Sequence, residues 1–106
     1  MKSEADSLAP ADIVLSLNGR DKGKRFIIIG TEDEYVLLAD GKSRKYEKPK
    51  RKKSKHVKFE DKAQGSTAEK IITKSKVTNS ELRKYMAEYA AINSSKGDMQ
   101  TCQRTT

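Results

Sequence analysis

Five short segments that carry apolar side chains follow one another between residues 12 and 59, and turn-forming residues separate them. Segments of this length are typical of β-strands, because amphipathic helices need longer periodic stretches. Short strands joined by tight turns favour a strongly bent antiparallel sheet that closes into a barrel. The chain is therefore expected to be mostly β, with one small barrel of about five strands formed by residues 12–60.

The first three strands are predicted from two kinds of apolar pattern. Ile13, Leu15 and Leu17 recur at every second position, which is the period of a strand with one apolar face. Residues 26–29 and 35–39 are continuous apolar runs rich in β-branched and aromatic side chains. Such runs indicate the two central strands of the sheet.

The last two strands are predicted from turn signals and alternation. The Asp-Gly pair at 40–41 is typical of a two-residue hairpin turn, which would lead into a fourth strand at 44–47. Pro49 would end that strand, because proline has no amide hydrogen to donate to a neighbouring strand. Val57 and Phe59 alternate with polar residues and predict a fifth strand with two core side chains.

The regions that flank the sheet are mostly polar. Residues 1–11 are expected to form a disordered leader and residues 61–77 a linker, because both are rich in polar and small side chains. A helix is expected at 78–93, and the polar residues 94–106 are expected to be disordered.

The helix prediction depends on its first turn and on one apolar stripe. Thr78 and Glu81 have the spacing of a capping box, in which each side chain accepts a hydrogen bond from the other residue's amide. The stripe has helical periodicity and consists of Leu82, Tyr85, Met86, Tyr89 and Ile92. An isolated helix of this length is marginal. We therefore expect the stripe, including its two tyrosines, to pack on the core or on a partner.

The positive charge of the chain is concentrated in one segment. Residues 42–58 contain ten basic residues and one acid, so their net charge is +9, whereas all other residues together carry −1. Clustered cations of this kind are typical of proteins that neutralise the phosphates of a nucleic acid. A charged run can also be no more than a solvated loop, and composition leaves that alternative open.

Residues that enzymes and metal sites need are scarce. The chain has one histidine, His56, and one cysteine, Cys102, so neither a disulfide framework nor a zinc site is predicted. Residues 19–24 depart from the phosphate-binding loop of nucleotide hydrolases, because three residues separate the glycines and Arg25 replaces the magnesium-binding hydroxyl. They are interpreted as a tight turn in which Gly23 has a positive φ. We expect no enzymatic activity, no cofactor, no metal and no small-molecule substrate.

The apolar content also bears on location. No stretch has the length of a signal peptide or of a membrane-spanning helix, and the single cysteine fits a reducing compartment. A cytoplasmic protein without a membrane partner is therefore expected.

Three stretches form an ordered set: VLSLNGRDKGKRFIII at 14–29, DEYVLLADGKSRK at 33–45 and KPKRKKSKHV at 48–57. Together they resemble the KOW-type domain of small bacterial RNA-binding proteins, which are akin to a large-subunit ribosomal protein of archaea and eukaryotes. The stretch KVTNSELRKYM at 76–86 is similar to the tail of that bacterial group. Phe26 stands where many KOW motifs have a second glycine, a departure shared by the ribosomal-protein-like branch.

The resemblance implies an SH3-like barrel that binds structured RNA, with ribosomal RNA and ribosomal particles as the expected partners. Charge and resemblance together predict RNA contacts at Arg20, Lys22, Gly23, Lys24, Arg44, Lys45, Lys48, Lys50, Arg51, Lys52, Lys53, Lys55 and His56. Any base-specific contact is expected from Tyr46, which could equally be a core residue, or from His56. The alternative is a protein-docking barrel whose C-terminal helix binds a partner and whose cations bind nucleic acid only non-specifically.

Overall fold

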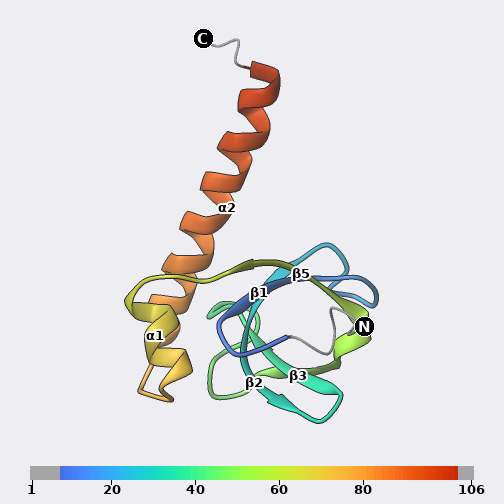
Figure 1. Cartoon of the computed structure of the whole chain (residues 1–106), viewed down its shortest axis with the longest axis vertical. Helices are drawn as coiled ribbons and strands as arrows, with labels where there is room; N and C mark the ends of the chain where they lie inside the picture. The colour runs from blue at the N-terminus through green and yellow to red at the C-terminus, as the bar shows by residue number, and fades with distance from the viewer. Residues whose placement is uncertain (1–7, 103–106) are drawn as a thin grey trace.

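The computed structural model describes residues 8–102, with side chains through residue 92. The elements, in chain order, are β1 (Asp12–Ser16), β2 (Arg25–Glu32), β3 (Tyr35–Ala39), β4 (Lys50–Lys53), the 3-10 helix η2 (Ser54–His56), β5 (Val57–Lys62), α1 (Ser66–Ile72) and α2 (Asn79–Cys102). Figure 1 shows the strands gathered beside the two helices. The prediction of a mostly-β chain is confirmed, and β2, β3 and β5 lie where the sequence predicts strands.

All five strands belong to one antiparallel sheet with the order β4-β3-β2-β1-β5. The register shifts between Ile13 and Val14, and again between Ile28 and Gly30. Irregularities of this kind bend a strand and increase its twist, and the sheet curls on itself, as Figure 1 shows. Among the described residues no ladder joins β4 to β5, so the sheet is open and the predicted closed barrel is not confirmed.

Both faces of the sheet bury apolar side chains, because successive residues of a strand point in opposite directions. One cluster, here called the strand core, consists of Val14, Phe26, Ile28, Val36, Leu38 and Val57. The other, the helix-side core, includes Ile13 and Ile27 of the sheet together with Ala68, Ile71, Val77 and Leu82. The continuous apolar run in β2 is thus explained, since its residues enter the two cores alternately.

The prediction of a single apolar face on the first strand is wrong. Ile13 and Val14 are both fully buried, one in each core. Leu17, predicted to share the face of Ile13, lies beyond the end of β1 and is 41% exposed. Because both faces of β1 are covered, alternation in the sequence does not distinguish a buried face from a solvent face.

The fourth strand is also not where the sequence places it. It is formed by Lys50–Lys53, and residues 40–49 are a loop rather than a two-residue turn and a strand. The Asp40 carboxylate accepts hydrogen bonds from the backbone amides two and four residues ahead and from the Ser43 hydroxyl. Such side-chain bonds fold the backbone locally and compete with strand pairing. Pro49 consequently precedes a strand instead of ending one.

Residues 61–77, predicted to be a linker, are part of the folded unit. The strand β5 extends to Lys62, and α1 follows it. Ala68, Ile71 and Val77 are each at most 3% exposed and belong to the helix-side core. These apolar residues are too sparse in the sequence to produce a recognisable helical period.

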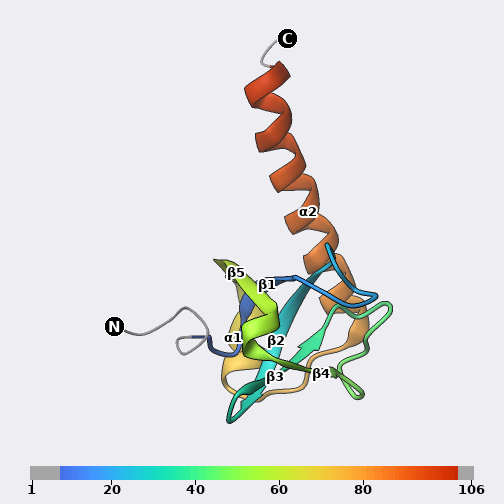
Figure 2. The same ribbon diagram turned by 90° about the vertical axis from the view of Figure 1, so that its right-hand side faces the viewer.

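The predicted leader and tail are each corrected in part, and residues 1–7 and 103–106 lie outside the described range. Ala11 is 3% exposed. Its amide donates to the Ile28 carbonyl, and its own carbonyl accepts a hydrogen bond from the Ala63 amide. At the other end, α2 continues beyond residue 93 to Cys102 and projects away from the sheet, as Figure 2 shows.

The first turn of α2 confirms the predicted capping box. The Thr78 hydroxyl accepts a hydrogen bond from the Glu81 amide at 3.1 Å, and the Glu81 carboxylate accepts one from the Thr78 amide at 3.3 Å. These reciprocal bonds satisfy amides that have no partner within the helix. They explain why the helix begins at Asn79.

The apolar stripe of α2 packs on the sheet for most of its length. Leu82 is fully buried in the helix-side core, and Tyr85, Met86 and Tyr89 pack against that core. Ile92 is 56% exposed. The helix is therefore a component of the core rather than an appendage to a self-sufficient barrel.

The beginning of α2 is joined to the loop between β3 and β4 by polar contacts. The Asn79 side chain accepts a hydrogen bond from the Tyr46 amide at 2.7 Å and donates to the Glu47 carboxylate at 3.0 Å. The Arg83 guanidinium donates to the Gly41 carbonyl at 3.0 Å. The helix thereby determines the path of this loop.

We expect Leu82→Ala to lower the free energy of unfolding by about 2 to 5 kcal/mol, because it removes a fully buried side chain and leaves a cavity. Ile92→Ala is the matched control, because Ile92 lies on the same stripe but is exposed. This variant should change the free energy of unfolding by less than about 0.5 kcal/mol. Urea denaturation followed by circular dichroism measures both. Equal, small effects would contradict the packing of α2 on the sheet.

Gly41 and Gly23 offer a second matched pair, because both have a positive φ, of 79° and 88° respectively. Nothing lies within 4 Å of a Cβ at Gly23, whereas a Cβ at Gly41 would overlap the Asn79 carbonyl oxygen. Gly23→Ala should cost about 1 to 2 kcal/mol of stability, the strain of a left-handed residue. Gly41→Ala should cost about 1 to 3 kcal/mol more, because α2 must also shift. Equal losses in thermal or urea denaturation would show that α2 does not pack closely on this loop.

Candidate nucleic-acid interface

The predicted contact residues lie in four parts of the fold. The loop between β1 and β2 contains Arg20, Lys22, Gly23 and Lys24, and the loop between β3 and β4 contains Arg44, Lys45 and Lys48. The strand β4 consists of Lys50, Arg51, Lys52 and Lys53, and η2 contains Lys55 and His56. We call residues 17–24 the β1–β2 loop and residues 40–49 the β3–β4 loop.

The β1–β2 loop is held against two of the other parts. Its first amide donates to the His56 carbonyl at 2.9 Å, and the Asn18 carbonyl accepts a hydrogen bond from the Lys52 ammonium at 2.7 Å. The Asp21 carboxylate lies 3.4 Å from the Lys50 ammonium. The structure therefore brings the cations of residues 20–24 beside those of β4 and η2, although the two groups are far apart in the sequence.

A groove connects the β1–β2 loop with the β3–β4 loop and α2. It has a volume of about 540 Å³, and Lys24 and Lys42 line it together with Arg83, Met86 and Ala87 of the helix. Through this groove the basic surface continues from the loops onto α2.

The four cations of β4 are not equivalent free charges. Lys52 is only 9% exposed and its ammonium is bonded to the Asn18 carbonyl. Arg51 pairs with Glu32 at 3.0 Å, and its guanidinium carbon lies 3.8 Å from the centre of the Tyr35 ring. The run 50–53 is therefore a strand whose side chains take part in the fold, and not a solvated loop.

Six of the predicted cations are exposed and form no ion pair with any other residue in the described part of the chain. They are Arg20, Lys22, Lys24, Lys45, Lys48 and Lys55, and we call them the free cations. Arg44 and Lys53 are half-buried beside them. Because the fold does not neutralise the free cations, they are available to a polyanionic ligand.

The aromatic candidates for base contacts are mostly core residues. Tyr46 is half-buried and packs against the helix-side core. Tyr85 and Tyr89 also pack there, as predicted, and the Tyr85 hydroxyl accepts a hydrogen bond from the Gln64 amide at 3.0 Å. His56, half-buried in η2 next to the β1–β2 loop, is the candidate that lies among the cations.

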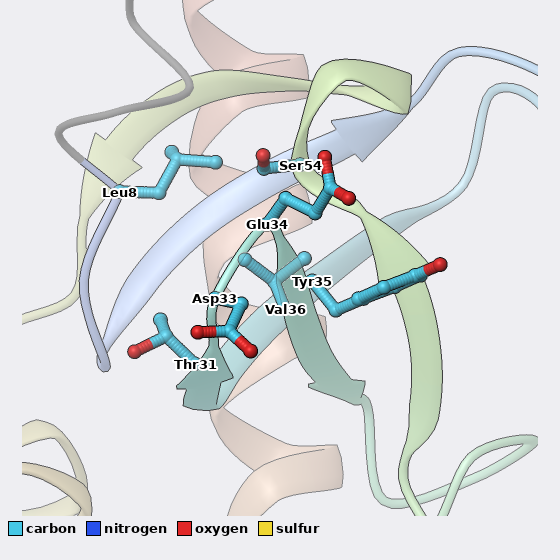
Figure 3. Close-up of a pocket in the computed structure, with 7 residues that line it drawn as sticks. All are labelled: Leu8, Thr31, Asp33, Glu34, Tyr35, Val36 and Ser54. Carbon is cyan, nitrogen blue, oxygen red and sulfur yellow. The ribbon is translucent and has the colours of Figure 1, made fainter.

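The opposite end of β2 has the opposite charge. A pocket of about 420 Å³ at the turn between β2 and β3 is lined by Asp33 and Glu34, together with Thr31, Tyr35 and Ser54. Figure 3 shows the two carboxylates among the side chains that surround it. Carboxylates repel phosphate, so the candidate interface ends before this turn.

Three residues at the interface were missed at the level of sequence. Lys42 belongs to the basic segment but is not among the predicted contacts, and Arg83 lies in the predicted helix outside its apolar stripe. Leu17, predicted to be a core residue, is exposed at the start of the β1–β2 loop. The local sequence pattern does not predict that these residues lie at the interface, because their position depends on how α2 and the loops pack together.

Among the side chains of residues 8–92, no group of three or more His, Cys, Asp or Glu is arranged to hold a metal ion. No helix within residues 8–102 combines the length and the apolarity needed to cross a membrane.

Comparison with known proteins finds no family model that matches the chain and no similar curated protein.

Two glutamates that hold the β3–β4 loop and α2 in place have lowered pKa values. A side-chain hydrogen bond from Asn79, helped by a backbone amide, lowers the pKa of Glu47 below 4.5. The hydrogen bond from Lys70, helped by the Thr78 amide, lowers the pKa of Glu81 in the same way. Both carboxylates are thus stabilised in their charged form by contacts that exist only in the folded chain.

A carboxylate whose pKa is lower in the folded chain stabilises the fold fully above its unfolded pKa and less as pH falls through the folded value. We therefore expect the stability of the wild type to fall below pH 4.5 more steeply than that of a Glu47→Gln, Glu81→Gln double variant. Urea denaturation at a series of pH values measures the difference. Glu88→Gln, at an exposed position of α2, is the control and should keep the wild-type slope. A double variant with that same slope would contradict the two assignments.

Proposed function

We propose that the protein is a non-enzymatic RNA-binding protein that holds structured RNA by means of the free cations. The observation that carries the proposal is the attachment of the β1–β2 loop to β4 and η2, through the Lys52 bond to Asn18 and the Lys50 pair with Asp21. These contacts gather cations from separate segments into one surface. A solvated charge run would have no need of such an arrangement.

Phosphate is the chemical group that this surface fits best. The free cations form no ion pair within the described structure, and their neutralisation by phosphates would release the counterions of the RNA. Contacts of this kind fix the position of a nucleic acid but distinguish little between sequences. Recognition would therefore rest on the shape of the RNA, with His56 as a candidate for contact with a base.

The architecture supports the same class of function. The sheet is strongly bent, and its two edge strands, β4 and β5, are consecutive in the chain and separated only by η2. We propose that this is an SH3-like arrangement of the KOW type, as the sequence resemblance implies. Ribosomal RNA in the cytoplasm is the partner that the proposal favours.

The alternative, a barrel whose C-terminal helix binds a protein partner, has less support. Its premise is that the apolar stripe of α2 is free. Leu82 is fully buried in the helix-side core, and Tyr85, Met86 and Tyr89 pack against it. Only Ile92 of the stripe is largely exposed, which is too little apolar surface to specify a partner.

The proposal is tested by replacing Arg20, Lys22 and Lys24 with Gln, because these residues are exposed and take no part in the core. If all three contact phosphates, the slope of log affinity against log salt should fall in magnitude by about 2.1 to 2.7. Fluorescence anisotropy with a labelled hairpin RNA at several salt concentrations measures the slope. Thermal denaturation should show an unchanged fold.

The matched control replaces Lys74, Lys76 and Lys84 with Gln, which removes the same charge from exposed positions outside the interface. This variant should keep nearly the wild-type slope. Equal slopes for both variants and the wild type, with the folds intact, would show that the β1–β2 loop does not contact RNA. A wild type that fails to bind RNA at low salt would contradict the proposal altogether.

A further inference from the structure

The groove between the loops and α2 combines an apolar floor with a cationic rim. Met86, Ala87 and Ala90 form its side on the helix, whereas Lys24 and Lys42 lie on the opposite side, in the two loops. Its volume of about 540 Å³ falls within the range of about 300 to 1,000 Å³ that is typical of sites for small ligands.

The lining of the groove has a net positive charge, because it contains the four cations Lys24, Arg25, Lys42 and Arg83 and one acid. Asp40 is the one acid among its lining residues. Its carboxylate already accepts three hydrogen bonds from its own loop, two from amides and one from the Ser43 hydroxyl. Arg25 is paired with Glu60. Lys24 and Lys42 have no ion-pair partner among the side chains of residues 8–92.

Arg83 adds a cation that is fixed in place. Its guanidinium donates to the Gly41 carbonyl at 3.0 Å and to the Ser80 hydroxyl at 3.3 Å, both of which are neutral groups. The positive charge is therefore retained and positioned at the groove. A ligand that suits this site has an anionic group next to a flat or apolar one.

We propose that the groove binds one unpaired nucleotide of the RNA, with the base on Met86, Ala87 and Ala90 and the phosphate between Lys24 and Lys42. The inference deepens the proposed function and rests on it. Lys24 belongs both to the groove and to the free cations of the β1–β2 loop. An RNA strand held along that loop therefore reaches the groove without a break, and this continuity favours a nucleotide over a segment of protein. Unpaired bases are also the part of an RNA that proteins recognise most readily.

The experiment compares two hairpin RNAs that differ by one bulged uridine in an otherwise paired stem. The wild type should bind the bulged hairpin about fivefold more tightly, the lower end of what stacking of one base on an aromatic side chain contributes, because the floor of the groove is apolar but not aromatic. Ala87→Glu places an acid on the floor of the groove and should reduce this preference to nearly equal affinities. Ala87 is exposed, so the variant should melt at the wild-type temperature.

The control is Ala91→Glu, which adds the same charge one turn farther along α2, at an exposed position that does not line the groove. It should keep the fivefold preference. A wild type without preference for the bulged RNA, as expected if the groove held a protein segment, would overturn the inference, as would an Ala87→Glu variant that retains the preference. In both cases RNA binding itself would stand. A wild type that binds neither hairpin would instead refute the proposed function.

Discussion

The need to bury both faces of one small curled sheet determines most of this structure. The bulges in β5 and β2 let the sheet bend around its strand core. The other face remains apolar at Ile13 and Ile27 and is covered by Ile71 of α1 and Leu82 of α2. A sheet of this size buries little surface by itself. The two helices are therefore a condition for the fold and not additions to it.

The helix α2, which covers one face of the sheet, also positions the loops of the candidate interface. Because α2 begins at the β3–β4 loop, its Asn79 and Arg83 side chains can bond to that loop and hold its cations in position. The β1–β2 loop is positioned separately by the largely buried Lys52 of β4. Residues that stabilise the fold and residues that present charge are thus neighbours in the same short segments, which couples the stability of the loops to the shape of the basic surface.

Sequence was sufficient where structure depends on local pattern. The strands β2 and β3 follow from β-branched and aromatic runs, and β5 follows from the alternation of Val57 and Phe59 with polar residues. The capping box of Thr78 and Glu81 follows from spacing alone. The strand β4 could not be predicted, because four consecutive cations become a strand only by pairing with β3, where Leu38 faces Lys50. The basic segment was identified from composition. The sequence does not show which of these cations form contacts within the fold, because the partners of Lys52 and Arg51 are 34 and 19 residues away in the chain.

The composition of β4 has a consequence for how molecules of this protein meet one another. An open sheet exposes backbone groups along its outer strands, and such edges readily add a strand from a second molecule and start aggregates. At this edge every residue from Lys50 to Lys53 is a cation. Two copies that approach edge to edge bring like charges together within the spacing of paired strands. The charge of β4 therefore disfavours edge-to-edge pairing of two copies at this strand.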